Sequence, residues 1–125
     1  MSEIIVNLHE SDQIPDELLG FAVIVARHGD KWLFCRHQDR DTYEIPGGHR
    51  EPGEDIDYTA KRELSEETGA VDFTCEPVSV YSVTRGNKTT YGKVYFASVN
   101  EIGILSPESE IAEVYHFDTL PDEMT

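Results

Sequence analysis

The sequence predicts one α+β or mixed α/β domain, in which β-strands lie before and after a single central helix. Two apolar, β-prone runs at 21–27 and 31–36 predict early strands. The segment at 55–68 is rich in helix-forming residues, and a long β-prone stretch follows it. A chain of 125 residues suits one hydrophobic core, so we expect a single domain over residues 1–125.

The early strands are expected to form a hairpin. The runs FAVIVAR at 21–27 and KWLFCR at 31–36 are separated by His-Gly-Asp at 28–30, which predicts a turn. A short strand is expected at 43–45. It should end at the Pro-Gly-Gly sequence of 46–48, where the glycines predict a tight turn.

The central helix has an apolar stripe and a predicted end. Ile56, Ala60 and Leu64 recur every four residues within 55–68, which predicts one buried face of an amphipathic helix. Gly69 follows directly, at the position where a glycine commonly caps a helix C-terminus.

Further strands are predicted after the helix. The β-prone stretch at 71–83 contains Pro77, which predicts a break. A loop is expected at 86–87, with strands at 91–99 and 113–117.

Composition excludes several classes of protein. Ten basic residues against twenty-five acidic ones give a formal net charge of -15, whereas a protein that grips long nucleic acid needs a basic surface. No apolar run approaches the roughly 20 residues of a membrane span, and residues 1–10 do not resemble a signal peptide. Cys35 and Cys75 form no CxxC pair, so we expect two free thiols in a reducing compartment, the cytoplasm.

Three carboxylates of the helix are the first candidate site. Glu63, Glu66 and Glu67 stand at i, i+3 and i+4, so they project from neighbouring positions of one face. Their mutual repulsion is relieved if a cation lies among them, and oxygen ligands suit Mg²⁺ or Mn²⁺. On the helix alone, an ordinary surface in which Arg62 pairs with Glu66 is the stronger interpretation.

The preceding loop changes that balance. The segment Gly48 to Ala70, GHREPGEDIDYTAKRELSEETGA, resembles the Nudix box, which is Gly, five residues, Glu, seven residues, Arg-Glu, an aliphatic residue, any residue, Glu-Glu, any residue, Gly. The matching residues are Gly48, Glu54, Arg62, Glu63, Leu64, Glu66, Glu67 and Gly69. Eight such matches have a chance probability on the order of 10⁻⁹ at ordinary residue frequencies. Ala70 departs from the pattern, because a larger aliphatic residue is usual there.

The resemblance implies a Nudix-type α/β/α sandwich with a mixed sheet, and an enzyme that hydrolyses a diphosphate linkage in a nucleoside diphosphate-X substrate. A nucleoside triphosphate, such as the oxidised 8-oxo-dGTP, is the first choice of substrate. The alternatives are an ADP-ribose or nucleotide-sugar pyrophosphatase, an RNA 5′ pyrophosphohydrolase, or a catalytically inactive nucleotide-binding domain. Members of the family often have a C-terminal helix, and the sequence pattern of this chain does not predict one. The resemblance also implies that a homodimer is one oligomeric state to expect.

The resemblance also assigns roles to residues of the box. It implies Mg²⁺, replaceable by Mn²⁺, held by Glu63, Glu66, Glu67 and the Gly47 carbonyl. Arg62 would orient the helix carboxylates. Structural support of the site would come from Gly48, Glu54 and Gly69.

Outside the box, the assignments are less specific. Members of the family use different glutamates as the general base, and Glu110 is preferred here over Glu108 and Glu113. Tyr43, in an approach to the box that resembles the MutT-like branch, is a candidate for substrate binding together with Arg27 and Arg36. Further along the chain, Arg85 and Lys88 could also contact substrate phosphates, although ordinary surface charges are the stronger interpretation. The aromatic residues Tyr81, Tyr91 and Phe96 could stack on a base, although aromatic residues of strands more often belong to the core.

Overall fold

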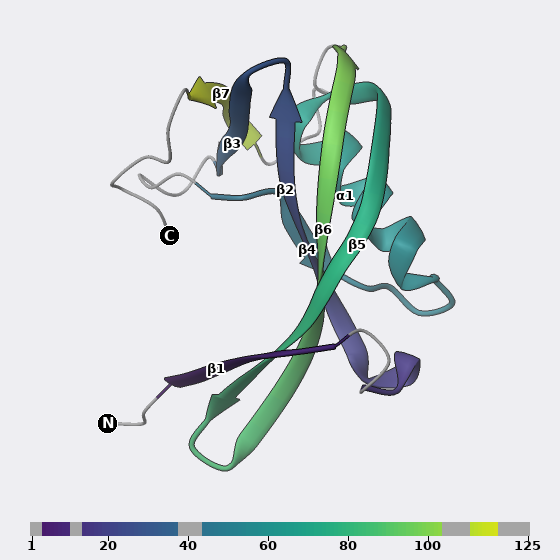
Figure 1. The fold of residues 1–125 in the computed structure, drawn as a ribbon, viewed down its shortest axis with the longest axis vertical. Coiled ribbons are helices and arrows are strands. Elements are labelled where there is room, and N and C mark those ends of the chain that lie inside the picture. The colour runs from purple at the N-terminus through teal and green to yellow at the C-terminus, as the bar shows by residue number, and fades with distance from the viewer. Residues whose placement is uncertain (1–3, 11–13, 38–43, 104–110, 118–125) are drawn as a thin grey trace.

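The computed structural model describes residues 4–10, 14–37, 44–103 and 111–117 (Figure 1). These residues form one mixed sheet in the order β1-β5-β6-β2-β3-β7, with β4 paired to β2 off this path. The elements are β1 (Ile4–His9), the 3-10 helix η1 (Asp16–Leu18), β2 (Leu19–His28), β3 (Lys31–His37), β4 (Gly47–His49), α1 (Ile56–Thr68), β5 (Ala70–Arg85), β6 (Lys88–Ile102) and β7 (Ile111–Phe117).

The hydrophobic core lies between α1 and the upper part of the sheet. Ile56, Ala60 and Leu64 are each at most 1% exposed, which confirms the predicted apolar stripe. They pack against alternate residues of the central strands, among them Ile24 of β2 and Tyr95 of β6. Strands β2 and β6 are parallel neighbours, whereas the other strand pairs of the described residues are antiparallel. The lower part of the β5–β6 hairpin extends away from α1, and β1 pairs antiparallel with β5 there (Figure 1).

The predicted hairpin at 21–36 is confirmed, since β2 and β3 pair in register at Arg27 with Trp32. The prediction that 46–48 is only a tight turn is wrong, because β4 begins at Gly47 and pairs with β2. Gly47 allows this close pairing, because a Cβ at this position would lie 2.5 Å from the Ala22 carbonyl oxygen. Upstream, Glu44 makes only an isolated bridge to Cys35, so the described part of 43–45 is not a regular strand.

The predicted break at Pro77 is also wrong. Strand β5 runs without interruption from Ala70 to Arg85, and a register shift between Pro77 and Ser79 accommodates the residue that cannot donate a hydrogen bond. Strand β6 is longer at both ends than the predicted 91–99. Strand β1 was not predicted from the sequence. It lies at the edge of the sheet, and nearly all of its residues are exposed. Because neither face of this strand is buried, its sequence does not need to alternate between apolar and polar residues.

The end of α1 agrees with the prediction. Gly69 adopts φ 79°, in the left-handed region, and its N–H donates to the Ser65 carbonyl at 2.9 Å. Among the described residues α1 is the only α-helix, so the second helical layer of the expected sandwich does not lie within them. Neither described helix has the length and apolar character required to cross a membrane.

Candidate functional site

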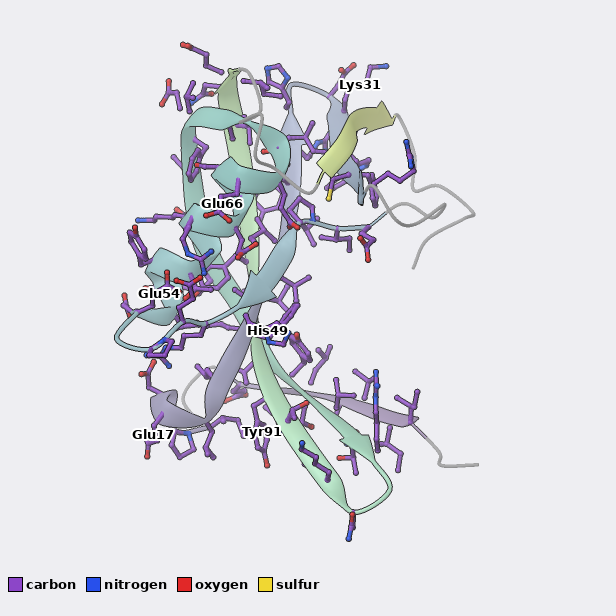
Figure 2. All side chains as sticks on the ribbon, turned by 180° about the vertical axis from the view of Figure 1, so that it is seen from behind. Glu17, Lys31, His49, Glu54, Glu66 and Tyr91 are labelled. Carbon is purple, nitrogen blue, oxygen red and sulfur yellow. The ribbon has the colours of Figure 1, made fainter. Side chains whose placement is uncertain are left out.

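The candidate site lies where α1 faces the loop that follows β4. Figure 2 shows Glu54 in this loop and Glu66 on α1 on the same side of the molecule. The helix carboxylates differ in their surroundings: Glu67 is buried at 7% exposure, and the side chains of Glu63 and Glu66 are 13% and 57% exposed. The helical spacing therefore creates a gradient from a buried to a solvent-exposed carboxylate.

Arg62 connects these acids to the loop. Its Nε and Nη2 donate to the two carboxylate oxygens of Glu54 at 2.6 and 3.0 Å, a bidentate geometry that only a guanidinium provides. Its Nη1 donates to Glu63 at 2.7 Å and lies 3.3 Å from Glu66. Its Nη2 also donates to the His49 carbonyl at 3.1 Å. One side chain, 16% exposed, thus joins β4, the loop and two helix carboxylates.

Glu54 is the partner that holds Arg62 in place. Its Oε1 also accepts hydrogen bonds from the Glu51 N–H at 2.9 Å and the Thr59 hydroxyl at 2.8 Å. The hydrogen bond from Arg62, followed by that from Glu51, lowers the pKa of Glu54 from 4.5 to about 2. Its stabilising contribution is therefore present above pH 4.5 and is lost as the pH falls through about 2.

Glu67 is the most buried of the three helix carboxylates. Its Oε1 accepts a hydrogen bond from the Gly47 N–H at 2.7 Å. Burial raises the pKa of Glu67 to about 8, with the negative charges of Glu63, Glu44 and Glu66 acting in the same direction and the Gly47 hydrogen bond opposing them. A negative charge at Glu67 is therefore unfavourable unless a positive charge is brought to it.

Gly48 has no side chain because Glu63 occupies the space. A Cβ at Gly48 would lie 2.3 Å from the Glu63 Cδ and 2.5 Å from its Oε2. Burial raises the pKa of Glu63, whereas the hydrogen bond from Arg62 lowers it. The first glycine of the box is thus explained by the position of a carboxylate fifteen residues later in the chain.

We predict that Gly48→Ala displaces the Glu63 carboxylate, because contacts of this length are not tolerated. The free energy of unfolding of the variant should be about 1–3 kcal/mol lower than that of wild type. Any activity that depends on Glu63 should fall by roughly 10- to 100-fold. Thermal unfolding and steady-state kinetics measure the two effects. Gly20→Ala is a matched control for stability, since its added Cβ meets no atom within 4 Å. Wild-type stability and kinetics in Gly48→Ala would contradict this account.

The donor set has the chemistry of a site for a hard divalent cation. Carboxylate oxygens and the Gly47 carbonyl are oxygen ligands, and a cation would offset the unfavourable charge at Glu67. Within the described ranges, however, no group of three or more His, Cys, Asp or Glu side chains is already gathered around one point. Glu63 and Glu66 instead turn toward Arg62. Metal binding by Glu63, Glu66 and Glu67 therefore stays a prediction that requires Glu66, which is mostly exposed, to reorient.

The other predicted site residues lie around this cluster or beyond the described residues. Arg27 is on β2, with its guanidinium 4.6 Å from the centre of the Trp32 ring. Its Nε is buried and has no hydrogen-bond partner among the described residues. Arg36 is on β3 and pairs in register with Glu113 of β7. Tyr43, Glu108 and Glu110 lie outside the described residues. The roles predicted for these residues, like those of the box, stay predictions.

Two residues near the site were not identified from the sequence. Glu44 lies close enough for its charge to raise the pKa of Glu67, and the bridge to Cys35 holds its backbone in place. Arg50 donates to the carbonyls of Glu54, Asp16 and Leu19 at 2.7, 2.9 and 3.2 Å, so it ties the loop to η1. Neither role could be recognised from the sequence. The Arg50 side chain donates mainly to backbone carbonyls, which every residue has, and Glu44 is bridged to Cys35 through its own backbone.

Comparison with known proteins agrees with this geometry. The family model of the NUDIX domain matches residues 17–124. The chain is 33% identical over 102 residues to YtkD of Bacillus subtilis (strain 168), a candidate 8-oxo-dGTP diphosphatase, covering 82% of this chain and 64% of YtkD. It is also 32% identical over 80 residues to an ADP-ribose pyrophosphatase of the same organism, covering 64% of this chain and 42% of that protein.

Among solved structures, a mutant of the Bacillus subtilis pyrophosphohydrolase BsRppH superposes with a TM-score of 0.82 at 32% identity, covering 94% of this chain and 73% of that one. A NUDIX hydrolase from Nitrosomonas europaea superposes with a TM-score of 0.57 at 26% identity, covering 79% of this chain and 72% of that one. The chain spans less than two thirds of the length of the curated relatives described above. The match over residues 17–124, together with the fold and the arrangement of Arg62 and the glutamates around it, shows that the chain belongs to the Nudix family.

Proposed function

We propose that this protein hydrolyses a diphosphate linkage in a nucleoside diphosphate-X substrate with the help of Mg²⁺. A nucleoside triphosphate, 8-oxo-dGTP among the candidates, would yield a nucleoside monophosphate and pyrophosphate. The observation that carries this proposal is the arrangement of Glu54, Glu63 and Glu66 around Arg62, with Glu67 buried beside Gly47. The names of YtkD and BsRppH support the class of reaction.

Glu63, Glu66, Glu67 and the Gly47 carbonyl would hold the cation. A divalent cation bound there lowers the pKa of a coordinated water and neutralises charge on the diphosphate oxygens. Without a cation, a diphosphate would be repelled by the carboxylates and by a protein whose formal net charge is -15. This dependence explains how so acidic a protein would bind a polyanion.

The protein's own groups would position the reacting atoms. Arg62, held by Glu54 and the His49 carbonyl, fixes the direction of the Glu63 carboxylate. The Gly47 N–H fixes the position of one oxygen of the Glu67 carboxylate. Such preorganisation removes the cost of reorienting charged groups during the reaction. Glu110 is proposed as the group that takes the proton from the attacking water, with Glu108 and Glu113 as alternatives.

A hydrolysis screen tests the proposal. Canonical and oxidised nucleoside triphosphates, ADP-ribose, nucleotide sugars, dinucleoside polyphosphates and 5′-triphosphate RNA would each be incubated with the protein and Mg²⁺, and the products separated by chromatography. We expect a monophosphate and pyrophosphate from at least one triphosphate, and no product when EDTA replaces Mg²⁺. A Glu67→Gln sample prepared in parallel controls for contaminating hydrolases. Equal hydrolysis with EDTA, or by that variant, would refute the proposal.

A further inference from the structure

The first residues of β2 carry an irregularity that faces the loop at 50–54. The register between β2 and the parallel strand β6 shifts between Leu19 and Phe21, so Gly20 lies opposite no residue of β6. Such a shift takes backbone groups out of the regular ladder of hydrogen bonds. The carbonyls of Leu19 and Gly20 accept hydrogen bonds from Arg50, at 3.2 Å from its Nη1 and at 2.9 Å from its backbone N–H. One residue of the loop therefore binds the backbone of β2 at this irregularity.

The side chain of Arg50 also closes the loop on itself. Its Nε donates to the carbonyl of Glu54, four residues later in the chain, at 2.7 Å. On the side of η1, its Nη1 and Nη2 donate to the carbonyl and the carboxylate of Asp16 at 2.9 and 3.0 Å. Figure 2 shows η1, marked by Glu17, on the same side of the molecule as Glu54. We call these contacts the Arg50 clamp, in which Arg50 binds Asp16, Leu19, Gly20 and Glu54.

The clamp attaches this loop to the start of the sheet. Among the described residues, each hydrogen bond between residues 50–54 and η1 or β2 is donated by Arg50. The Glu54 N–H donates to the Glu51 carbonyl at 3.0 Å, and the Glu51 N–H donates to the Glu54 carboxylate at 2.9 Å. These two hydrogen bonds are internal, so they shape the loop without attaching it. Removal of the Arg50 side chain therefore leaves only its backbone hydrogen bond to Gly20.

The position of Glu54 affects that of Arg62. The backbone of Glu54 accepts the hydrogen bond from Arg50, and its carboxylate accepts two from Arg62 at 2.6 and 3.0 Å. Because a carboxylate moves with its own backbone, displacement of the loop would move the acceptor of Arg62. The Nη1 of Arg62 in turn donates to Glu63 at 2.7 Å. Groups that act on a substrate must be held to within about 0.5 Å, and the clamp lies at the start of this series of contacts.

We propose that Arg50 is a positioning residue of the candidate site, which acts by holding Glu54 and thereby the direction of Arg62 and Glu63. The kinetic part of this inference rests on the proposed function, whereas the geometric part concerns Arg62 alone. An arginine suits this role, because its planar guanidinium presents donors on three nitrogens in a fixed arrangement. A lysine has the same charge but donates from a single nitrogen, so it reaches fewer of the four acceptors of the side chain.

Nuclear magnetic resonance of the Arg62 Nε–H group tests the geometry without substrate or metal. In isotopically labelled wild type, in EDTA, this hydrogen should exchange slowly with water, because it is held by the Glu54 carboxylate. Arg50→Met removes the donors of the clamp and keeps an unbranched side chain. We expect this variant to speed the exchange by about 10-fold or more, and Arg50→Lys to have an intermediate effect. Lys61→Met, at the exposed position next to Arg62, is the matched control and should exchange like wild type.

Steady-state kinetics at saturating Mg²⁺, below the Tm of each variant, tests the consequence for the reaction. Arg50→Met should lower kcat by about 10- to 100-fold and change KM by less than about 3-fold, because the clamp orients the acidic groups and does not bind the substrate. Arg50→Lys should recover part of kcat. Asp16→Asn removes only the ion pair of the clamp, in which the Asp16 carboxylate is 62% exposed, so it should stay within about 3-fold of wild type.

A purely structural role for Arg50 would give a different set of results. A lower Tm for Arg50→Met, with wild-type exchange at Arg62 and wild-type kcat, would overturn the proposal. Arg50→Lys, the milder change, provides the same comparison if Arg50→Met does not fold. Exchange at Arg62 that depends on Arg50, in a protein that hydrolyses none of the substrates, would refute the proposed function and support the clamp.

Discussion

Replacing Glu67 with glutamine is expected to reduce Mg²⁺-dependent hydrolysis by about 100-fold or more, while the protein stays folded. Glu67 is buried, and its carboxylate is the one that most needs a cation nearby. Glutamine has nearly the same volume, and its amide oxygen can still accept the hydrogen bond from Gly47. The substitution therefore removes a charge and leaves the packing intact.

Steady-state kinetics at saturating Mg²⁺ and thermal unfolding would measure these two quantities for Glu67→Gln. We expect the Tm to be unchanged or slightly raised, because the substitution removes a buried charge that its acidic neighbours oppose. Glu76→Gln, at an exposed position of β5, controls for the general loss of one negative charge. Turnover within a few-fold of wild type would show that Glu67 is not a metal ligand.

Replacing Arg62 with alanine should affect both stability and activity. The side chain pairs with Glu54 and Glu63, which are 10% and 13% exposed, and its loss leaves their negative charges close together without a cation. We expect the Tm to fall by roughly 5–15 °C. Hydrolysis should fall by roughly 10- to 100-fold, because Glu63 and Glu66 lose the group that orients them.

Two further variants separate charge from geometry at this position. Arg62→Lys retains the positive charge but cannot contact both oxygens of Glu54, so it should recover part of the stability and little of the activity. Lys61→Ala, the neighbouring exposed position of α1, should match wild type in both measurements. If Arg62→Lys had wild-type kinetics, the bidentate contact would have no role in positioning the site.

Much of the fold could be predicted from local sequence patterns. The apolar stripe of Ile56, Ala60 and Leu64 predicted the buried face of α1, and Gly69 predicted its end. The strands at 21–27 and 31–36 were predicted correctly because each is apolar over a short run and a turn separates them. By contrast, β1 and β4 were not identified. One is exposed at a sheet edge and the other consists of two glycines and a histidine, so neither has an apolar pattern.

For the candidate site, the sequence by itself determined the spacing of Glu63, Glu66 and Glu67 on one helix face, because helical geometry is local. Only the tertiary structure decided that Arg62 binds Glu54 and the His49 carbonyl, and that Gly48 is small because Glu63 lies against it. The same holds for the contact between the rings of Phe21 and His49, which depends on the register between β2 and β4. Strand register is decided by packing between segments distant in the chain, and no local pattern specifies it.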